Sequence, residues 1–471
     1  MDGLECSEID RSELERTLRI DSEFYSKSAI KVSDMLQSRS HDLLTTFVNV
    51  SDGNHMGISD YFIDEGVPYY RGQDAGAFFI ENSNPICIDE KTFELPVMKR
   101  SHLKKGDVIL SIVGTIGSLS LVYSDKSATC SCKLAILRPK EGKNAELLAT
   151  FLRGKYGQAQ ITRFTRGAVQ KGLILEDMDQ LVVPVFGDGI VEAIRNAIQS
   201  AYQIQEKANN CYREAQRTLV NSVGSISVPA ESVSVRNIST SFYTTGRLDA
   251  EYYQPKYDAL FTALSTIKTK KLGGAHGIVN IEKSIEPGSG VYVEDGIPFV
   301  RVSDVSKFEI SEPEVKLRND ILPNPEVLFP QKDTILLSKD GSVGIAYKTE
   351  STMPVITSGA LLHLTVRNKA EVLPDYLTLV LNSPIVQLQA ERDSNGAIIQ
   401  HWKPSEIENV IIPVLDMDIQ KEIATKVQES FALRKQSKQL LEYAKQAVEM
   451  AIEQGEDVAL VWLKDKIPVE V

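Results

Sequence analysis

The sequence is poor in cysteine and in long apolar runs. Its 471 residues include five cysteines, which are too few and too scattered for a disulfide framework: Cys6, Cys87, Cys130, Cys132 and Cys211. Cys130 and Cys132 are two residues apart, a spacing that places both on one face of a strand, and we interpret them as small buried residues rather than metal ligands. This cysteine usage suits a reducing environment, so we expect a cytoplasmic protein.

No apolar run is long enough for a membrane-spanning helix, which needs about 18 residues or more, and the longest runs, such as 108–113, have the length of strands. The N-terminal residues are acidic and lack the apolar core of a secretory signal. Hydrophobic residues make up 42% of the chain and charged residues 25%, as in folded globular proteins. At roughly 100–200 residues per domain, the length predicts two to four domains.

Common catalytic motifs are also missing. The sequence has no P-loop motif, no G-x-S-x-G, no H-E-x-x-H, and no Pro-Pro pair of the kind that amino-methyltransferases use to hold a flipped base. The six histidines are dispersed without metal-ligand spacing. We therefore predict no catalytic residue and no metal site. One alternative stays open, because Asp304, Glu314 and Lys316 loosely resemble the acidic core of a metal-dependent nuclease.

The net charge is acidic: 52 Lys and Arg against 64 Asp and Glu give 52 − 64 = −12. This sum argues against a partner as acidic as DNA. The distribution argues otherwise, because residues 99–106 and 153–172 contain several basic side chains and no acidic one. We give the distribution more weight than the sum.

The chain is a long tandem repeat. Residues 19–25, R-I-D-S-E-F-Y, return as R-L-D-A-E-Y-Y at 247–253, an offset of 228. Three further segments return in the same order: D-E-G-V-P-Y-Y-R at 64–71, G-D-V-I-L through G-T-I-G at 106–117, and G-A-V at 167–169 leading to Pro184. Their counterparts are 294–301, 332–344, and 396–398 leading to Pro413. The protein is one module written twice.

Each copy begins with a globular part and ends with a long helix. Short apolar runs between turn residues predict a compact mixed α/β domain in each copy, at 1–185 and 223–414. After each domain, apolar residues recur at steps of three and four, which predicts long helices at 186–222 and 415–455, ended by Gly455, with a tail at 456–471. The recurring residues form one narrow seam along each predicted helix. In the first helix the seam comprises Ile190, Ile194, Ala197, Ala201, Ile204, Ala208, Cys211 and Ala215. In the second it comprises Ile419, Ile423, Val427, Ser430, Arg434, Ser437, Leu441, Ala444 and Val448.

A narrow seam has two interpretations. Each helix could lie on its own domain, or the two helices could pair as a coiled coil that spaces the domains. Two equal seams at equivalent places favour pairing. We therefore expect an α+β protein with two mixed domains and two paired long helices.

These repeated segments resemble the specificity (S) subunit of type I restriction-modification systems. The resemblance spans both copies and rests on R-[I/L]-D-x-E-[F/Y]-Y, G-[V/I]-P-[Y/F]-x-R, D-x-I-L ending in G-[T/S]-[I/V]-G, and G-A-[V/I]. It implies two target recognition domains, each reading half of a bipartite DNA target, separated by an antiparallel coiled coil. It also implies that two methyltransferase subunits and restriction/translocase subunits bind S-adenosylmethionine, ATP and Mg²⁺, while this chain binds double-stranded DNA without a cofactor.

Candidate DNA-binding residues follow from their position in these motifs. Arginine after a strand offers a planar fork for guanine or phosphate, and Gly/Ser/Thr-rich turns offer hydroxyls and backbone N–H groups. In the first copy the candidates are Tyr70, Arg71, Lys99, Arg100, Lys104, Lys105, Thr115, Arg163, Arg166, Gln170 and Lys171. In the second copy they are Arg301, Ser338, Lys339, Ser342, Arg392, Asn395, Gln400, His401 and Lys403. Structural roles, such as strand-end ion pairs, plain turns and solvated helix faces, remain alternatives for these residues. A protein-interaction scaffold without DNA is a further alternative for the whole chain.

Overall fold

A computed structural model describes residues 5–17, 19–80, 85–167, 169–224, 234–396 and 400–467. The chain divides into two compact units: a first unit of Met1–Gln205 with Lys435–Val471, and a second unit of Glu206–Arg434. Ala168 and residues 397–399, which belong to the repeated G-A motif, lie outside the described residues, as do 468–471 of the expected tail.

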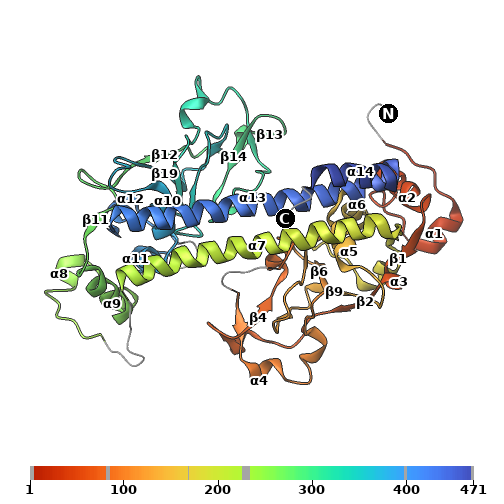
Figure 1. Ribbon diagram of the computed structural model, residues 1–471, viewed down its shortest axis with the longest axis horizontal. Helices are drawn as coiled ribbons and strands as arrows, with labels where there is room; N and C mark the ends of the chain where they lie inside the picture. The colour runs from red at the N-terminus through yellow and green to blue at the C-terminus, as the bar shows by residue number, and fades with distance from the viewer. Residues whose placement is uncertain are drawn as a thin grey trace. The chain divides into compact units, whose positions relative to one another are not determined.

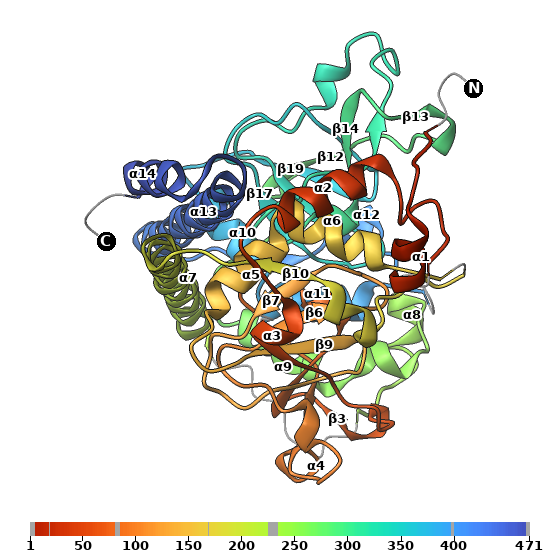
Figure 2. The same ribbon diagram turned by 90° about the vertical axis from the view of Figure 1, so that its right-hand side faces the viewer.

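The main sheet of the first unit is antiparallel and four-stranded. Its strands are, in spatial order, β2 (Val48–Asp52), β9 (Leu134–Pro139), β6 (Val108–Ser111) and β7 (Leu119–Leu121). All four residues of β6 are buried, which explains its uninterrupted apolar run. Helix α5 (Ala145–Arg153) packs against β7, and α2 (Lys27–Gln37) lies along α6 (Lys155–Phe164), as Figure 2 shows.

A smaller sheet and a strand pair complete the first unit. The smaller sheet has the order β3 (Phe62–Ile63), β5 (Cys87–Ile88), β4 (Val67–Tyr70) and β8 (Thr129–Cys130), and its β4–β8 pair is parallel. The strand pair joins β1 (His41–Leu43) to β10 (Val182–Pro184). This pairing places the end of the domain beside its beginning.

The second unit repeats this topology strand for strand. Its main sheet has the order β12 (Val279–Lys283), β19 (Leu361–Val366), β16 (Ile335–Ser338) and β17 (Ala346–Lys348). The smaller sheet has the order β13 (Tyr292–Val293), β15 (Lys316–Leu317), β14 (Ile297–Val300) and β18 (Ile356–Thr357), and β11 (Thr269–Lys271) pairs with β20 (Ile411–Pro413). Helices α10 (Pro374–Leu381) and α11 (Pro384–Asp393) take the places of α5 and α6. The predicted mixed α/β modules are confirmed.

Side-chain contacts are repeated as well. Gln158 Nε2 donates to Gly117 O at 3.0 Å, and Gln387 Nε2 donates to Gly344 O at 2.8 Å. Gly117 and Gly344 have φ of 87° and 88°. Because side chains with a Cβ disfavour this left-handed conformation, the last glycine of G-[T/S]-[I/V]-G is required by the turn.

The two long helices are α7 (Asp188–Val223) and α13 (Met417–Gln454), of 36 and 38 residues. In the second unit, Ser430 Oγ donates to Ala208 O at 2.7 Å, and Thr218 Oγ1 donates to Glu422 Oε1 at 3.2 Å. Numbers that rise along one helix fall along the other, so the helices pair antiparallel (Figure 1). In the first unit, Ser437 Oγ donates to Ala201 O at 2.8 Å. The predicted helix pairing is confirmed.

The helices also pack on the domains. In the second unit, Tyr212 and Leu219 of α7 and Ile423 and Val427 of α13 share one core with Tyr376 of α10. Both interpretations of the seam therefore apply, because each helix has an apolar face wide enough to contact its domain and the other long helix. In two places the buried residue is the neighbour of the one predicted. Tyr212 and Leu440 are buried, while the predicted Cys211 and Leu441 are only partly buried.

Three smaller expectations can be compared with the structure. Cys130 is buried in β8, and burial raises the pKa of its thiol, whereas Cys132 lies in the following turn and is partly exposed, so the expected shared strand face is wrong. Gly455 follows the last residue of α13, as predicted. The expected tail forms a further helix, α14 (Glu456–Lys466). Among the described helices, none is both long and apolar enough to cross a membrane.

Candidate nucleic-acid interface

Three of the predicted segments meet at one place in the first unit. Thr115 Oγ1, in the turn after β6, donates to the carbonyl of Gly72, the residue that follows Arg71, at 3.0 Å. The same turn pairs with the loop after α6: Val113 forms a bridge with Gly172, and Leu173 N donates to Ile112 O at 2.9 Å. The strand-end arginine, the glycine-rich turn and the 166–172 loop thus form one surface.

The second unit brings together the corresponding segments. Gly341 N donates to Gln400 O at 2.9 Å, and Trp402 N donates to Lys339 O at 2.8 Å, so the turn after β16 pairs with the segment after α11. Asn395 and His401 exchange backbone hydrogen bonds of 3.0 and 2.7 Å, which pair these two residues of that segment. His401 Nδ1 also lies 2.8 Å from Asp340 Oδ1, in the turn.

Arg71 and Arg301 have the same geometry in the two units. Their backbone N–H groups donate to Asp74 Oδ2 and Asp304 Oδ2 at 2.8 and 2.7 Å. Each Nε lies 3.7 or 3.8 Å from the same carboxylate, and the side chains are 37% and 41% exposed. The backbone of each arginine is thereby fixed beside the aspartate and its side chain is partly exposed, an arrangement suited to phosphate or base contact. Tyr70 is partly buried and packs on the core.

Arg163 is not available for DNA. Its side chain is 8% exposed, its Nε donates to Phe24 O at 2.9 Å, and its Cζ lies 4.2 Å from the Phe24 ring centroid. Arg19 covers the same ring at 4.6 Å and donates to Asp21 at 2.7 Å. We call this stack of two arginines around one aromatic ring the first clasp. It fastens the R-[I/L]-D-x-E-[F/Y]-Y motif to α6.

Arg392 has the same structural role in the second unit. Tyr252 lies between Arg247 and Arg392, whose Cζ atoms are 4.6 and 5.0 Å from its ring centroid, and this stack is the second clasp. Arg392 also lies 4.4 Å from the Phe261 ring and donates to Asp393 at 2.7 Å. The expectations that Arg163 and Arg392 contact DNA are therefore corrected. A signal was present in the sequence, because these arginines recur at an offset of 229, as the G-A motif residues do.

In the folded protein, basic side chains of the acid-free stretch 153–172 pair with carboxylates from outside it. Arg166 forms two hydrogen bonds with the buried carboxylate of Asp177, which raise the pKa of the guanidinium, and Lys155 pairs with Glu453. Arg153 donates to Leu119 O at 2.7 Å. Arg166 is still 43% exposed. Carboxylates from other parts of the chain pair with these basic residues. The sequence of 153–172 therefore predicts more free positive charge than the folded protein has.

Other predicted residues divide between exposed and internal positions. Ser338 is fully buried, and its hydroxyl donates to Ser342 O at 2.5 Å and accepts from Ile345 N at 2.8 Å, so it shapes the turn and is removed from the candidate DNA contacts. Lys339 is 16% exposed and pairs with Asp340. The exposed candidates at the two loop surfaces are Thr115, Gln170, Lys171, Ser342, Asn395, Gln400, His401 and Lys403.

The second basic cluster lies on other elements of the first unit. Lys99 and Arg100 are in a short 3-10 helix, Lys99–Ser101, and Arg100 pairs with Asp52 at the end of β2. Lys104 and Lys105 line an open groove of about 440 Å³ that Arg138, Lys140 and Lys143 also border. Carboxylates offset much of this charge, since Arg138 pairs with Asp107 at 2.6 Å and Lys143 with Asp42 at 2.8 Å.

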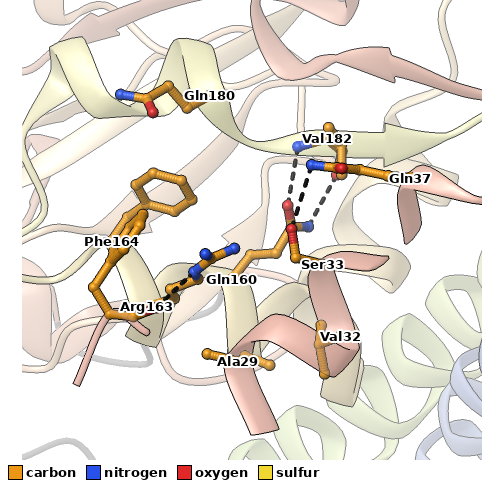
Figure 3. Close-up of a pocket in the computed structure, with 11 residues that line it drawn as sticks. Ala29, Val32, Ser33, Gln37, Gln160, Arg163, Phe164, Gln180 and Val182 are labelled. Atoms are coloured by element: carbon orange, nitrogen blue, oxygen red, sulfur yellow. Dashed lines mark hydrogen bonds between the residues drawn. The ribbon is translucent and has the colours of Figure 1, made fainter. Parts of the chain in front are cut away.

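A small cavity lies beside the first clasp (Figure 3). Ala29, Val32 and Ser33 of α2 and Arg163 and Phe164 of α6 line it, and its volume is about 20 Å³. Gln160 bridges to Val182 through two hydrogen bonds of 3.0 Å. Such a volume suits a water molecule rather than an organic ligand.

The nuclease alternative gains no support from its three residues. Asp304 caps the turn after β14 in the same way as Asp74 caps the turn after β4, and Lys316 lies 3.9 Å from Asp295. In the part of the chain that the structure describes, no group of three or more His, Cys, Asp and Glu side chains is arranged to hold a metal ion.

Comparisons with known proteins agree with the repeated motifs. Residues 289–443 match the family described as the type I restriction modification DNA specificity domain. No curated protein matches the chain. Similar solved structures include the S subunit of a type I restriction-modification system from M. genitalium, at 14% identity over 92% of this chain and 96% of that chain, with a TM-score of 0.36. The HsdS subunit from Thermoanaerobacter tengcongensis matches at 14% identity over 92% and 97%, with a TM-score of 0.28.

The sequence match to residues 289–443 carries the comparison, because the TM-scores of the solved structures are below 0.5. The matched segment extends from the beginning of the smaller sheet into α13 and includes Arg301, the turn after β16 and the paired residues Asn395 and His401. The predicted resemblance is confirmed for this segment: residues 289–443 match the type I restriction modification DNA specificity domain.

Proposed function

We propose that this chain is a non-catalytic subunit that recognises a bipartite DNA target and directs methyltransferase and restriction subunits to it. The observation that supports this proposal most strongly is the repeated interface. The two units present the same three segments, a strand-end arginine, a glycine-rich turn and a loop after a helix, but with different side chains at their tips. We infer that each unit is a target recognition domain and that the two half-sites differ in sequence.

Recognition in each unit would combine a shared and a variable part. Arg71 and Arg301 are held identically, so they suit contacts common to both half-sites, such as phosphates. The turns differ: Val113, Gly114 and Thr115 in the first unit correspond to Asp340, Gly341 and Ser342 in the second. Since sequence is read by side chains at base edges, these tips are the candidates for base readout.

Partners would supply the chemistry. We infer that two methyltransferase subunits bring S-adenosylmethionine, and that restriction/translocase subunits bring ATP and Mg²⁺, all acting on double-stranded DNA in the cytoplasm. The chain itself would need no cofactor. The segments 186–222 and 415–455 would then serve as the spacer between recognition domains at 1–185 and 223–414, with 456–471 as the tail.

The test is the methylation pattern of a genome. The chain is co-expressed with a type I methyltransferase subunit from the same source, and modified adenines are mapped by long-read sequencing. We expect methylation at one bipartite motif only when the chain is present. An Arg301→Ala variant should weaken methylation of the whole motif, while Val327→Ser, at an exposed site, should leave it unchanged.

Two other results would overturn the proposal. Cleavage of plasmid DNA by the purified chain with Mg²⁺ and no partner would favour the nuclease alternative. Assembly with a methyltransferase without any change in where adenine is modified would favour a scaffold that does not read DNA.

A further inference from the structure

The clasps leave one part of the repeated motif unexplained. In R-[I/L]-D-x-E-[F/Y]-Y, the arginine, the aspartate and the aromatic residue all form contacts within the clasp. The aliphatic residue and the glutamate point outward. Ile20 is 91% exposed and Leu248 is 72% exposed, and both stand at the same position of the motif. Glu23 and Glu251 are exposed as well.

Single exposed aliphatic residues are ordinary on protein surfaces. The aliphatic residue of the motif differs because it recurs, as Ile20 and Leu248, in two copies that have diverged over most of their length. It is not part of the core of either unit. Arg19 and Phe24 on either side of Ile20 are 7% and 1% exposed, so the clasp holds the segment that presents it. A fixed, solvent-exposed aliphatic side chain that is kept in both copies suits a partner that is bound twice.

The charge around this residue argues for a protein partner rather than DNA. Asp21 and Glu23 are 44% and 83% exposed, and Asp249 and Glu251 occupy the same places in the second motif. Carboxylates beside an exposed aliphatic side chain repel phosphates, whereas an apolar socket bordered by basic side chains would complement them. Arg19 pairs with Asp21 within the clasp, and Lys171 Nζ lies 3.8 Å from Glu23 Oε2.

That same contact places the motif beside the candidate DNA surface. Lys171 belongs to the 166–172 loop, and Arg19 NH1 also donates to Phe164 O, at the end of α6, at 3.3 Å. In the second unit, Asn395 Nδ2 donates to the backbone of Asp393, the aspartate that pairs with the clasp residue Arg392. A protein seated on either motif would therefore border the loop that faces DNA.

We propose that Ile20 with Glu23, and Leu248 with Glu251, are two equivalent docking points for two copies of one DNA-modifying subunit, each inserting the aliphatic side chain into a basic-rimmed apolar socket. The proposal rests on the proposed function, because it assigns a surface of this chain to the methyltransferase subunits. It adds the position and the chemistry of the contact.

The test uses the full chain and the co-expressed methyltransferase subunit, with stoichiometry measured by native mass spectrometry and affinity by titration. The wild-type chain should bind two copies. Ile20→Ser and Leu248→Ser should each weaken one of the two binding steps by roughly tenfold, and the double variant should weaken both. The matched control is Val327→Ser, which removes an aliphatic side chain that is 77% exposed but lies outside the motif.

DNA binding by the chain alone separates this inference from the proposed function. The double variant should bind target DNA as the wild type does. If it still binds two methyltransferase copies with wild-type affinity, the docking points are wrong and the proposed function stands. If the wild-type chain binds no methyltransferase, both are wrong. If the serine variants lose helical circular dichroism, the double variant Glu23→Gln with Glu251→Gln is tested instead. Unchanged affinity and unchanged salt dependence of partner binding in that variant would overturn the inference.

Discussion

At the scale of single residues, the arginines divide into two classes that the sequence does not separate. Arg71 and Arg301 have partly exposed side chains, whereas Arg163 and Arg392 stack on aromatic rings inside the domains. Arginine suits both roles, because its planar group can pair with phosphate or lie flat on a ring. Burial and neighbours decide which role each arginine has.

The clasp arginines should contribute to stability. Replacing Arg163 by alanine removes a hydrogen bond and a cation–π contact in a nearly buried site, so we expect a loss of about 2–3 kcal/mol in the free energy of unfolding. Urea denaturation followed by fluorescence measures this loss. Lys171→Ala, at a 65% exposed side chain, is the control and should change stability by less than about 0.5 kcal/mol.

The strand-end arginines should contribute to DNA binding instead. Arg71→Ala and Arg301→Ala should each lower the magnitude of the salt slope of DNA affinity by roughly 0.9 if the arginine contacts one phosphate. Fluorescence anisotropy at several salt concentrations gives this slope. The same slope for a variant and the wild type would remove that arginine from the interface.

One buried histidine predicts a dependence of stability on pH. His363 in β19 is 9% exposed, its Nε2 lies 2.8 Å from Thr357 Oγ1, and burial lowers its pKa from 6.5 to about 4. Because the unfolded chain takes up a proton near pH 6.5 and the folded chain only near pH 4, stability is highest above pH 6.5 and falls as the pH drops towards 4. The loss in the second unit should reach up to about 3 kcal/mol.

The first unit supplies the matched replacement for this histidine. Ile136 pairs with Ile109 in the first main sheet, and His363 pairs with Leu336 at the corresponding position of the second. His363→Ile should therefore reduce the difference between denaturation midpoints at pH 7.5 and 4.5. A difference as large as that of the wild type would show that other groups cause the acid sensitivity.

At the scale of elements, the α7–α13 pair depends on small residues at its closest points. Ser430 and Ser437 are almost fully buried and donate to carbonyls of the facing helix. A larger side chain there must push the helices apart. The serines recur seven residues apart, as the seam requires.

Substitutions at Ser437 should separate size from polarity. Ser437→Ala loses one hydrogen bond whose acceptor keeps its helical partner, so we expect a cost below about 1 kcal/mol. Ser437→Leu overfills the seam and should cost about 1–3 kcal/mol. Thermal melts followed by circular dichroism compare the two, with Lys435→Leu as an exposed control; equal costs for Ala and Leu would contradict close packing.

At the scale of the whole molecule, the tandem repeat gives the proposed function a spacing requirement. Two recognition units in one chain raise each other's effective concentration only on DNA whose half-sites lie at the matching distance. Inserting two base pairs between the half-sites should therefore remove most of the gain in affinity over a single half-site. Competition binding with spacer variants measures this effect, and equal affinity for all spacers would rule out a fixed separation.

The sequence by itself determined the repeat, the mixed α/β character of each copy and the two long helices, because these depend on order, periodicity and turn residues along the chain. The roles of Arg163, Arg392, Ser338 and Arg166 depend on partners far away in sequence, such as Phe24, Tyr252 and Asp177. The tertiary structure alone decided them, because burial and pairing are set by which distant segments meet in space, and it alone separated the outward Ile20 and Leu248 from the clasp residues beside them.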